Sequence, residues 1–361
     1  MDLRNVEKAW RVFWMRAIGR ALPGARQTTL PDRRVPLKVL FVRYERIGDM
    51  IMSTGMIRVL AQSRPHLILD VLANPTTRPV LEHNPHIRRV FTLDRRSASS
   101  YIETGKALRK EHYDVIVDGR INNPPVFTST PLLMLMAGAP YRVGVGGGNN
   151  DAIYNVAVEP YDRRIHYIEG SKALARPFGV DVEHADWQPE LFLTAEERTQ
   201  AEAVWHTATP SNGVEAPPPR LLVNLSASEP KRRWDDAHFI DVLQSVRARW
   251  ASLPIVVMGL PNEWERVQHV ATAVRAHPAP TPALRDALAL VGTSDRVFTP
   301  DTSISHAASA FRKPAVVLLK RDHHPYAPWK IPGDIVFWDG ETIHGLAVES
   351  VREPVLRLIA G

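Results

Sequence analysis

Short apolar runs alternate with amphipathic stretches along most of the chain. Between residue 37 and about residue 137, runs typical of buried strands are separated by stretches whose apolar residues recur every three or four positions, as on one face of a helix. The same alternation returns between residues 221 and 319. Strands that alternate with helices predict right-handed βαβ units and parallel sheets. The pattern therefore predicts an α/β protein with two halves.

The apolar runs also predict where the elements lie. Strands are expected at 37–44, 67–73, 89–93 and 114–118 in the first half, and at 221–225, 255–258, 297–299 and 315–319 in the second. Helices are expected near 50–63, 76–83, 97–111 and 126–137, and then near 235–249, 262–276 and 301–311. The link between the halves is expected within 177–190, before a helix that Thr194 and Glu197 begin in capping-box spacing.

Composition narrows the class of protein. A chain of 361 residues is expected to hold about two domains. It has no cysteine, which excludes disulfides, thiolate metal ligands and cysteine nucleophiles. The first 38 residues carry a basic excess equal to the net charge of the whole chain, +6. The remainder is near neutral, so we expect no nucleic-acid partner.

The basic excess lies on an amphipathic leader. Trp10, Phe13 and Trp14 share one face of a helix predicted over residues 4–22, and basic residues lie mostly elsewhere around it. This composition is typical of an anchor on an anionic membrane surface, although a helix packed on its own protein or on a partner subunit fits it equally well. No run approaches the roughly 18 apolar residues of a membrane span, and no signal peptide is evident. We therefore expect a cytoplasmic protein that is peripheral on the inner face of the cytoplasmic membrane. The stretch from the helix to Pro36 is expected to be a tether.

The first candidate site residues follow the first predicted strand. Arg43, Arg46 and Gly48 precede Asp49, which stands at the start of the next helix. Strand carboxyl ends and helix amino ends face one edge of a parallel sheet, so ligands are expected in the cleft between the two halves. Asp49 is then either a functional carboxylate aimed into the cleft or merely a helix cap.

Candidate anion-binding residues follow two strands of the second half. Lys231, Arg232 and Arg233 precede Trp234 in a loop of small residues that leads into a helix, an arrangement suited to a diphosphate. The alternative is a solvated basic turn with the tryptophan inside the domain. The run from residue 301 to 306, which enters another helix, supplies hydroxyls and free backbone N–H groups that also favour phosphate, or else an ordinary helix cap with a buried histidine.

The sequence gives no sign of a metal site. No Asp-x-Asp triplet is present. Two histidine pairs, His83 with His86 and His323 with His324, lack the carboxylate spacing that metal binding needs, and all four are predicted to lie on the surface.

In order along the chain, these segments resemble glycosyltransferase family 9, the ADP-heptose:lipopolysaccharide heptosyltransferase family. The resemblance runs from about residue 37 to the end and rests mainly on RYERIGDMIMSTGMIRVL and VFTPDTSISHAASAFRKPAVVLL. It implies a GT-B fold with two Rossmann-like domains. After the leader and tether at 1–36, an acceptor-binding domain would span 37–180, a nucleotide-sugar-binding domain 181–344, and a C-terminal helix 345–361.

The resemblance also implies the reaction and the residues that carry it. An inverting enzyme without metal or cofactor would transfer heptose from ADP-heptose to a lipopolysaccharide core or related lipid-linked glycan, with Asp49 as general base. Arg43, Arg46 and Arg120 would bind the acceptor. The donor would be bound by Lys231, Arg232, Gly259, Glu263, Asp301, Thr302, Ser303 and His306. Family members usually have lysine where this chain has Arg232, which leaves open the cation that meets the diphosphate. The alternatives are a nucleotide-sugar epimerase of similar fold and a catalytically silent binding scaffold.

Overall fold

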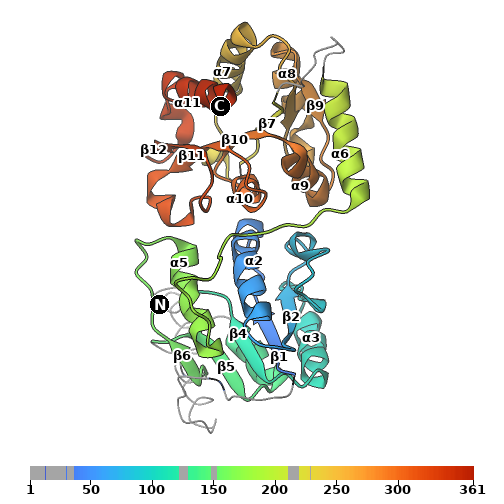
Figure 1. The fold of residues 1–361 in the computed structure, drawn as a ribbon, viewed down its shortest axis with the longest axis vertical. Coiled ribbons are helices and arrows are strands. Elements are labelled where there is room, and N and C mark those ends of the chain that lie inside the picture. Colours follow the sequence, from blue (N-terminus) through green and yellow to red (C-terminus); the bar gives the residue numbers. More distant parts are fainter. Residues whose placement is uncertain are drawn as a thin grey trace, which may run out of the picture. The chain divides into compact units, whose positions relative to one another are not determined.

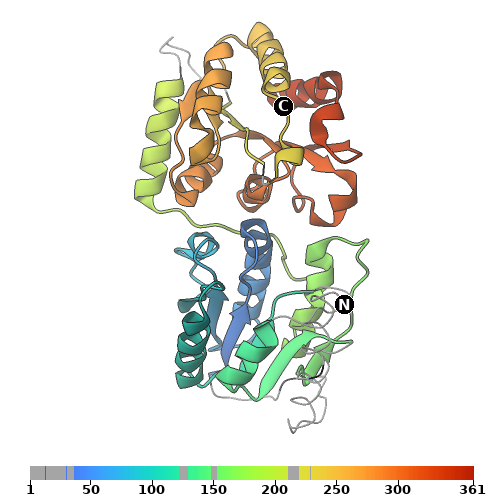
Figure 2. The same cartoon turned by 180° about the vertical axis from the view of Figure 1, so that it is seen from behind.

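Two parallel sheets organise the part of the chain that the structure describes (Figure 1). The computed structural model describes residues 13, 30, 36–121, 129–147, 153–209, 219–227 and 229–361. The chain divides into two units, 1–187 and 188–361. This division falls beyond the predicted boundary at 180/181 and inside the wider 177–190 segment. Figures 1 and 2 show each sheet from opposite sides, with helices on both faces.

The first unit contains a six-stranded sheet in the order β3-β2-β1-β4-β5-β6. All five strand pairings are parallel. The chain builds outward from β1 to β3 and then returns to start the other half of the sheet at β4, so the winding direction reverses between β1 and β4. The strands are β1 (Lys38–Val42), β2 (Ile68–Ala73), β3 (Arg89–Thr92), β4 (Val115–Asp118), β5 (Tyr141–Val145) and β6 (Val156–Val158).

Helices of the first unit pack on this sheet because each presents apolar residues to it. Helices α3 (Ala98–Lys110) and α4 (Ser129–Ala137) join one apolar core with β1 and β4 through Leu108, Leu133 and Met134. Helix α2 (Ile47–Gln62) packs on β2 and also contacts α5 (Tyr167–Ser171) and two 3-10 helices, η1 (Arg78–Leu81) and η3 (Lys172–Phe178).

The second unit repeats the plan with the strand order β12-β11-β10-β7-β8-β9, again entirely parallel. Here the winding reverses between β7 and β10. Its strands are β7 (Leu221–Asn224), β8 (Ile255–Met258), β9 (His277–Ala279), β10 (Arg296–Pro300), β11 (Ala315–Lys320) and β12 (Gly333–Trp338). Its helices are α6 (Ala195–Ala208), α7 (Asp236–Arg249), α8 (Trp264–Ala273), α9 (Leu284–Thr293), α10 (Ser303–Ala310) and α11 (Val348–Ala360), with 3-10 helices η4 (Pro230–Arg232), η5 (Pro261–Glu263), η6 (Arg321–Tyr326) and η7 (Ile343–Gly345).

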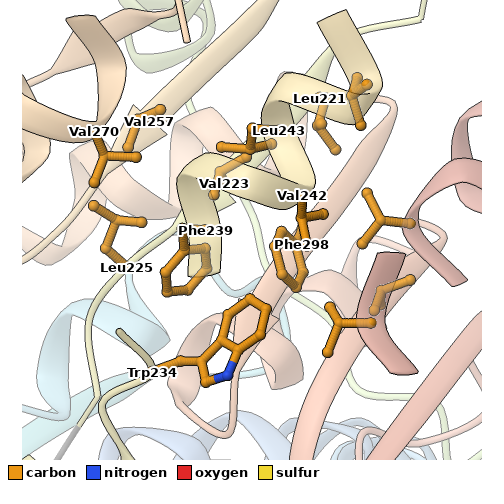
Figure 3. Packing of buried hydrophobic residues seen from close by; sticks show 14 of the residues in the cluster. Leu221, Val223, Leu225, Trp234, Phe239, Val242, Leu243, Val257, Val270 and Phe298 are labelled. Carbon is orange, nitrogen blue, oxygen red and sulfur yellow. The ribbon is translucent and has the colours of Figure 1, made fainter. Parts of the chain in front are cut away.

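An aromatic group forms part of the core between this sheet and helices α7, α8 and α11 (Figure 3). The rings of Trp234 and Phe239 lie 5.1 Å apart edge to face, and Phe298 from β10 lies 5.3 Å from Phe239. The indole N–H of Trp234 donates to the carbonyl of Leu346 at 3.2 Å. Trp234 therefore fixes the end of the basic loop that precedes it to the core of the unit.

The eight predicted strands are all present, but four more were missed. Strands β6 and β9 have three residues each, too few for an alternating pattern, and β9 contains a proline. Strands β5 and β12 contain glycine and charged residues that interrupt the apolar run. The helix predicted at 76–83 is only the 3-10 turn η1, because Pro79 stands near its start. Helix α9, which the prediction also missed, follows β9 directly.

The predicted leader and tether lie outside the described residues except for Phe13 and Pro36, which are exposed, and Leu30. Leu30 is 5% exposed, and its N–H donates to the carbonyl of Pro177 at 3.2 Å. The prediction of a loose tether is therefore wrong at Leu30, because an apolar side chain there packs into the first unit. No described helix has both the length and the apolar content required of a membrane span.

Candidate functional site

Polar side chains gather where the winding of each sheet reverses. In the first unit, the loops after β1 and β4 carry Arg43, Glu45 and Arg120, and Asp49 lies in the first turn of the helix that follows β1. In the second unit, the loops after β7 and β10 carry Arg232 and Asp301. At such a reversal, the loops that follow the two neighbouring strands turn to opposite sides of the sheet. Ligands of α/β proteins bind in the crevice that this leaves at the carboxyl ends of the strands. Each unit therefore has one candidate site at the carboxyl edge of its sheet.

Asp49 lies in the first turn of α2 and does not cap the helix. The N-cap position belongs to Arg46, whose side chain makes no capping hydrogen bond. The carboxylate of Asp49 instead lies 3.4 Å from Nη2 of Arg43, and its side chain is 18% exposed. The amino end of a helix favours a negative charge at this position. Asp49 is therefore not the N-cap residue, and its functional role stays a prediction.

Arg43 is the group that holds Asp49, and it is itself firmly held. Its side chain is 5% exposed, Nη1 donates to the carbonyl of Gly119 at 3.2 Å, and the guanidinium lies 5.0 Å above the ring of Tyr167. Glu45 lies 3.5 Å from its Nε. Burial alone would lower the pKa of Arg43, but Tyr167, Asp49 and Glu45 together raise it. Arg43 is thus a permanent buried cation beside the Asp49 carboxylate.

A second buried guanidinium extends this network. Arg120 makes a two-pronged contact with Asp118, from Nε to Oδ1 at 2.9 Å and from Nη2 to Oδ2 at 2.5 Å. Tyr154 donates to the same carboxylate at 2.6 Å, and Glu45 lies 3.5 Å from Arg120. Burial raises the pKa of Asp118, but the charge and hydrogen bonds of Arg120 outweigh burial and lower it. Glu45 therefore links two buried arginines, one of which holds Asp49.

The loop that carries these residues is fixed by its backbone as well. Asn74, which follows β2, donates from its amide to the carbonyls of Tyr44 at 2.6 Å and Glu45 at 3.2 Å. The hydroxyls of Tyr44 and Thr130 lie 2.5 Å apart. Asn74 was not among the predicted site residues, because only the parallel pairing of β1 with β2 brings it to this loop.

The three predicted acceptor residues fall into two environments. Arg43 and Arg120 have side chains 5% and 8% exposed, and both are engaged with carboxylates. Arg46 is exposed at the start of α2. Burial favours a positioning role for Arg43 and Arg120, whereas Arg46 has the exposure that contact with an acceptor needs.

In the second unit, Arg232 and Asp301 meet although 69 positions separate them. Nη1 of Arg232 lies 3.2 Å from Oδ2 of Asp301, and the two side chains are 12% and 11% exposed. The Nε–H of Arg232 is buried without a hydrogen-bond partner in the described part of the chain. His323 from η6 completes the cluster, with Nδ1 3.1 Å from Oδ2 of Asp301. The prediction that placed His323 among surface histidines missed this contact, because β11 separates it from the DTSISH segment.

The amino end of α10 forms the floor of this site. Thr302 is the N-cap, and its hydroxyl accepts from the N–H of Ile304 at 3.2 Å. Asn224, the last residue of β7, donates to the hydroxyls of Thr299 in β10 at 3.0 Å and of Thr302 at 3.3 Å, and so ties the two central strands to the start of α10. Ser303 begins the helix and is half-buried, whereas His306 is 6% exposed within it. The predicted helix start is therefore present, with its threonine in the capping role.

Glu263 and Gly259 belong to a neighbouring polar group after β8. The Glu263 carboxylate accepts from the Ser226 hydroxyl at 2.6 Å and the Leu260 N–H at 3.2 Å, and Arg233 pairs with it at 3.0 Å. A Cβ on Gly259 would lie 2.8 Å from a Val267 methyl and 3.3 Å from the Ser226 hydroxyl. Gly259 is thus required for the close approach of this loop to α8.

The three consecutive cations therefore differ in environment. Lys231 is 56% exposed and pairs with Glu229, Arg233 is 43% exposed and pairs with Glu263, and Arg232 alone of the three is largely buried. Of the other histidines considered, His83 and His324 are exposed and His86 is half-buried. No group of three or more metal-ligating side chains occurs among the residues that the structure describes.

Solved structures of similar fold define the class of protein. The glycosyl transferase family 9 protein from Veillonella parvula DSM 2008 is 17% identical with a TM-score of 0.75, covering 90% of this chain and 97% of that chain. The Escherichia coli heptosyltransferase WaaC with ADP is 16% identical with a TM-score of 0.69, covering 89% and 99%. With its two α/β units, this chain has the GT-B fold.

The sequence comparisons identify the family. The model of glycosyltransferase family 9 (heptosyltransferase) matches residues 102–335, a stretch that holds Arg120 and every candidate donor residue but begins after Asp49. Lipopolysaccharide heptosyltransferase 2 of Escherichia coli (strain K12) is 22% identical over 306 residues, covering 81% of this chain and 85% of that protein. The chain belongs to glycosyltransferase family 9. Membership of a glycosyltransferase family leaves no support for the epimerase or the silent scaffold.

The buried Asp118–Arg120 pair predicts how stability depends on pH. Because the folded state lowers the pKa of Asp118, the pair stabilises the fold above the unfolded pKa of about 3.9, and this contribution is lost as the pH falls. Asp118→Asn should lower the free energy of unfolding by about 3–5 kcal/mol at pH 7, the usual cost of breaking a buried pair, and by progressively less below about pH 4. Denaturant unfolding of the full chain between pH 7 and pH 2 measures both values.

Asp162→Asn is the matched control, because Asp162 pairs with Arg164 in an exposed position of the same unit. It should leave the free energy of unfolding nearly unchanged. If the free energy of unfolding of Asp118→Asn stays below that of the wild type by the same amount down to pH 2, the carboxylate charge is not the stabilising feature.

Proposed function

We propose that this protein is an inverting heptosyltransferase that moves heptose from ADP-heptose to a lipopolysaccharide core or related lipid-linked glycan. The observation that carries the proposal is the Asp49 carboxylate, held by buried Arg43 at the carboxyl edge of the first sheet in a chain of family 9. The names of the relatives, lipopolysaccharide heptosyltransferases, support the choice of sugar and acceptor. One protein of similar structure is a heptosyltransferase with ADP, which supports the choice of nucleotide.

In this proposal Asp49 acts as the general base. Its carboxylate accepts the proton of an acceptor hydroxyl as that oxygen bonds to the anomeric carbon of heptose. The bond from the anomeric carbon to the diphosphate breaks on the opposite face, so the configuration at this carbon inverts. Arg43 cannot take the proton, since its guanidinium stays charged, and it instead fixes the direction of the carboxylate. Arg46, exposed at the start of α2, contacts the acceptor.

The second unit binds the donor in this proposal. Arg232 meets the diphosphate and stabilises the charge that develops on it as the sugar departs. Thr302 and Ser303 add hydroxyl and backbone donors at the amino end of α10, where the helix dipole favours an anion. Asp301 orients Arg232, and Lys231 contributes charge from the rim. His306 supports the same helix from its buried position.

Glu263 and Gly259 shape the nucleoside end of the donor site. Gly259 lets the loop after β8 approach closely, and Glu263 fixes that loop through Ser226 and Leu260. The Glu263 oxygen that pairs with half-exposed Arg233 is the one we assign to the ribose hydroxyls. Neither a cofactor nor a metal ion takes part in the proposed reaction.

The leader places the enzyme at its acceptor. We propose that residues 4–22 bind an anionic membrane surface, because basic residues surround a face with Trp10, Phe13 and Trp14. A lipid-linked acceptor is confined to the same surface, so docking lets the enzyme search for it in two dimensions. The protein would then act on the cytoplasmic face of the inner membrane.

Removing the charge of Asp49 tests the proposed base. Asp49→Asn should lower kcat by about 10²–10⁴, the usual loss for an acid–base group, and leave the Kd for ADP-heptose nearly unchanged. Steady-state kinetics and calorimetry measure the two quantities. Asp94→Asn, an exposed carboxylate at the same edge of the sheet, is the control and should retain wild-type turnover. Near-normal kcat in Asp49→Asn would exclude it as the base.

The burial of Arg232 predicts which cation meets the diphosphate. Arg232→Ala should weaken ADP binding by about 1.5–3 kcal/mol, as for a charge-assisted contact. The exposed Lys231 should contribute less, so Lys231→Ala is the matched variant. Calorimetric titration of ADP into each variant compares them. Equal affinities for Arg232→Ala and the wild type would place the diphosphate elsewhere.

Truncation of the leader tests membrane docking. The full chain should sediment with anionic liposomes at low salt and be released at high salt. A chain lacking residues 1–28 keeps buried Leu30 and should lose this association while it retains activity on a soluble, delipidated acceptor. Equal sedimentation of the full and truncated chains would show that the leader is not the anchor. Unfolding of the truncated chain would show that the leader packs on the protein.

A further inference from the structure

His323 closes a triangle of polar groups at the carboxyl edge of the second sheet. Its Nδ1 lies 3.1 Å from Oδ2 of Asp301, and its Nε2 lies 3.3 Å from Nη2 of Arg232. The same Asp301 oxygen lies 3.2 Å from Nη1 of Arg232. Each of the three groups therefore touches both of the others, from loops that follow three different strands.

The partners of the two ring nitrogens define the tautomer that a neutral imidazole would adopt here. A guanidinium can only donate, so Nε2 of His323 must accept from Arg232. The proton of the neutral ring then lies on Nδ1 and is donated to Asp301. The charges of Arg232 and Asp301 cancel, so the triangle carries no net charge.

A diphosphate needs an excess of positive charge, and the described loop does not provide one. Lys231 pairs with Glu229 at 3.1 Å, and Arg233 pairs with Glu263 at 3.0 Å, so these cations are compensated as well. In the triangle, histidine is the residue type that titrates near neutral pH. His323 can therefore add a positive charge when an anion arrives.

The charged groups around the ring permit this change. Besides Asp301 and Arg232, Asp322 faces Nε2 of His323 at 3.9 Å. Lys320 hydrogen-bonds to Asp322 and lowers its pKa, so this carboxylate remains charged and favours an imidazolium. Glu229 lies 3.8 Å from the Arg232 guanidinium and can retain it in the loop when its contact with His323 breaks.

We propose that His323 binds the donor diphosphate together with Arg232 and takes up a proton as the diphosphate binds. This inference rests on the proposed function of the second unit as the nucleotide-sugar site. The proton comes from solvent and bonds to Nε2, which then can no longer accept from Arg232. Nε2–H and the released guanidinium N–H both donate to phosphate oxygens, while Nδ1–H continues to donate to Asp301. Asp301 thus orients both donors.

Linkage between protonation and binding gives the test. The probe is ADP-heptose, because its two phosphates do not titrate near neutral pH. Calorimetry of the full chain at pH 7.5 in two buffers with different heats of ionisation, Pipes and Tris, measures proton uptake on binding. The wild type should take up a substantial fraction of one proton, and its Kd should fall by about tenfold between pH 8 and pH 6.5.

Two variants separate this role from a structural one. His323→Gln keeps a donor for Asp301 but cannot titrate, so it should bind ADP-heptose more weakly, with no proton uptake and a Kd independent of pH. His324→Gln, the exposed neighbour, should behave as the wild type. A pH-independent Kd in the wild type, or proton uptake retained in His323→Gln, would overturn this proposal alone. Failure of the wild type to bind ADP-heptose at any pH would overturn both this proposal and the proposed donor.

Discussion

In a parallel sheet every strand runs the same way, so the carboxyl ends of all strands meet at one edge. Where the winding reverses, the loops that follow two neighbouring strands lead to opposite sides of the sheet. A crevice opens between them at the carboxyl ends of the strands, and side chains from both loops face it. In the first unit this constraint brings Arg43 and Arg120 to the same carboxylate, Glu45, across β1 and β4. In the second unit it joins Arg232 to Asp301 across β7 and β10. The residues of each candidate site are brought together by the pairing of strands that are distant in the sequence. The sequence of a single loop could not bring them together.

Charge compensation then fixes the side chains within each site. A buried guanidinium is costly unless its charge and N–H groups find partners, and a buried pair with a carboxylate holds both members in one geometry. In the first unit the chain of contacts from Asp118 through Arg120, Glu45 and Arg43 ends at Asp49. A carboxylate held in this way would need little reorganisation to act as the proposed base. In the second unit the cations are paired in the absence of a ligand, so the donor diphosphate that we propose binds there would have to exchange partners with Asp301 and His323.

Much of this arrangement could be predicted from the sequence because local patterns encode it. Eight strands, the Asp49 loop and the basic loop before Trp234 all follow from apolar periodicity and neighbouring residue types. Contacts between distant loops carry no such local signal. The pairing of β1 with β2 and β4 brings Asn74 and Glu45 to their partners. His323 reaches Asp301 only because β11 lies beside β10. The buried Leu30 was missed for the same reason, since its partner Pro177 is distant in the sequence.

In the proposed reaction, Asp49 activates the acceptor for direct displacement at the anomeric carbon. Direct displacement has a stereochemical consequence, because the acceptor must attack the face opposite the leaving diphosphate. A double displacement through an intermediate on the enzyme would instead retain the configuration. The most direct measurement is NMR of the product made from ADP-heptose of known anomeric configuration and a soluble acceptor. Direct displacement predicts that the new linkage has the opposite configuration to the donor. A linkage of the same configuration would contradict it.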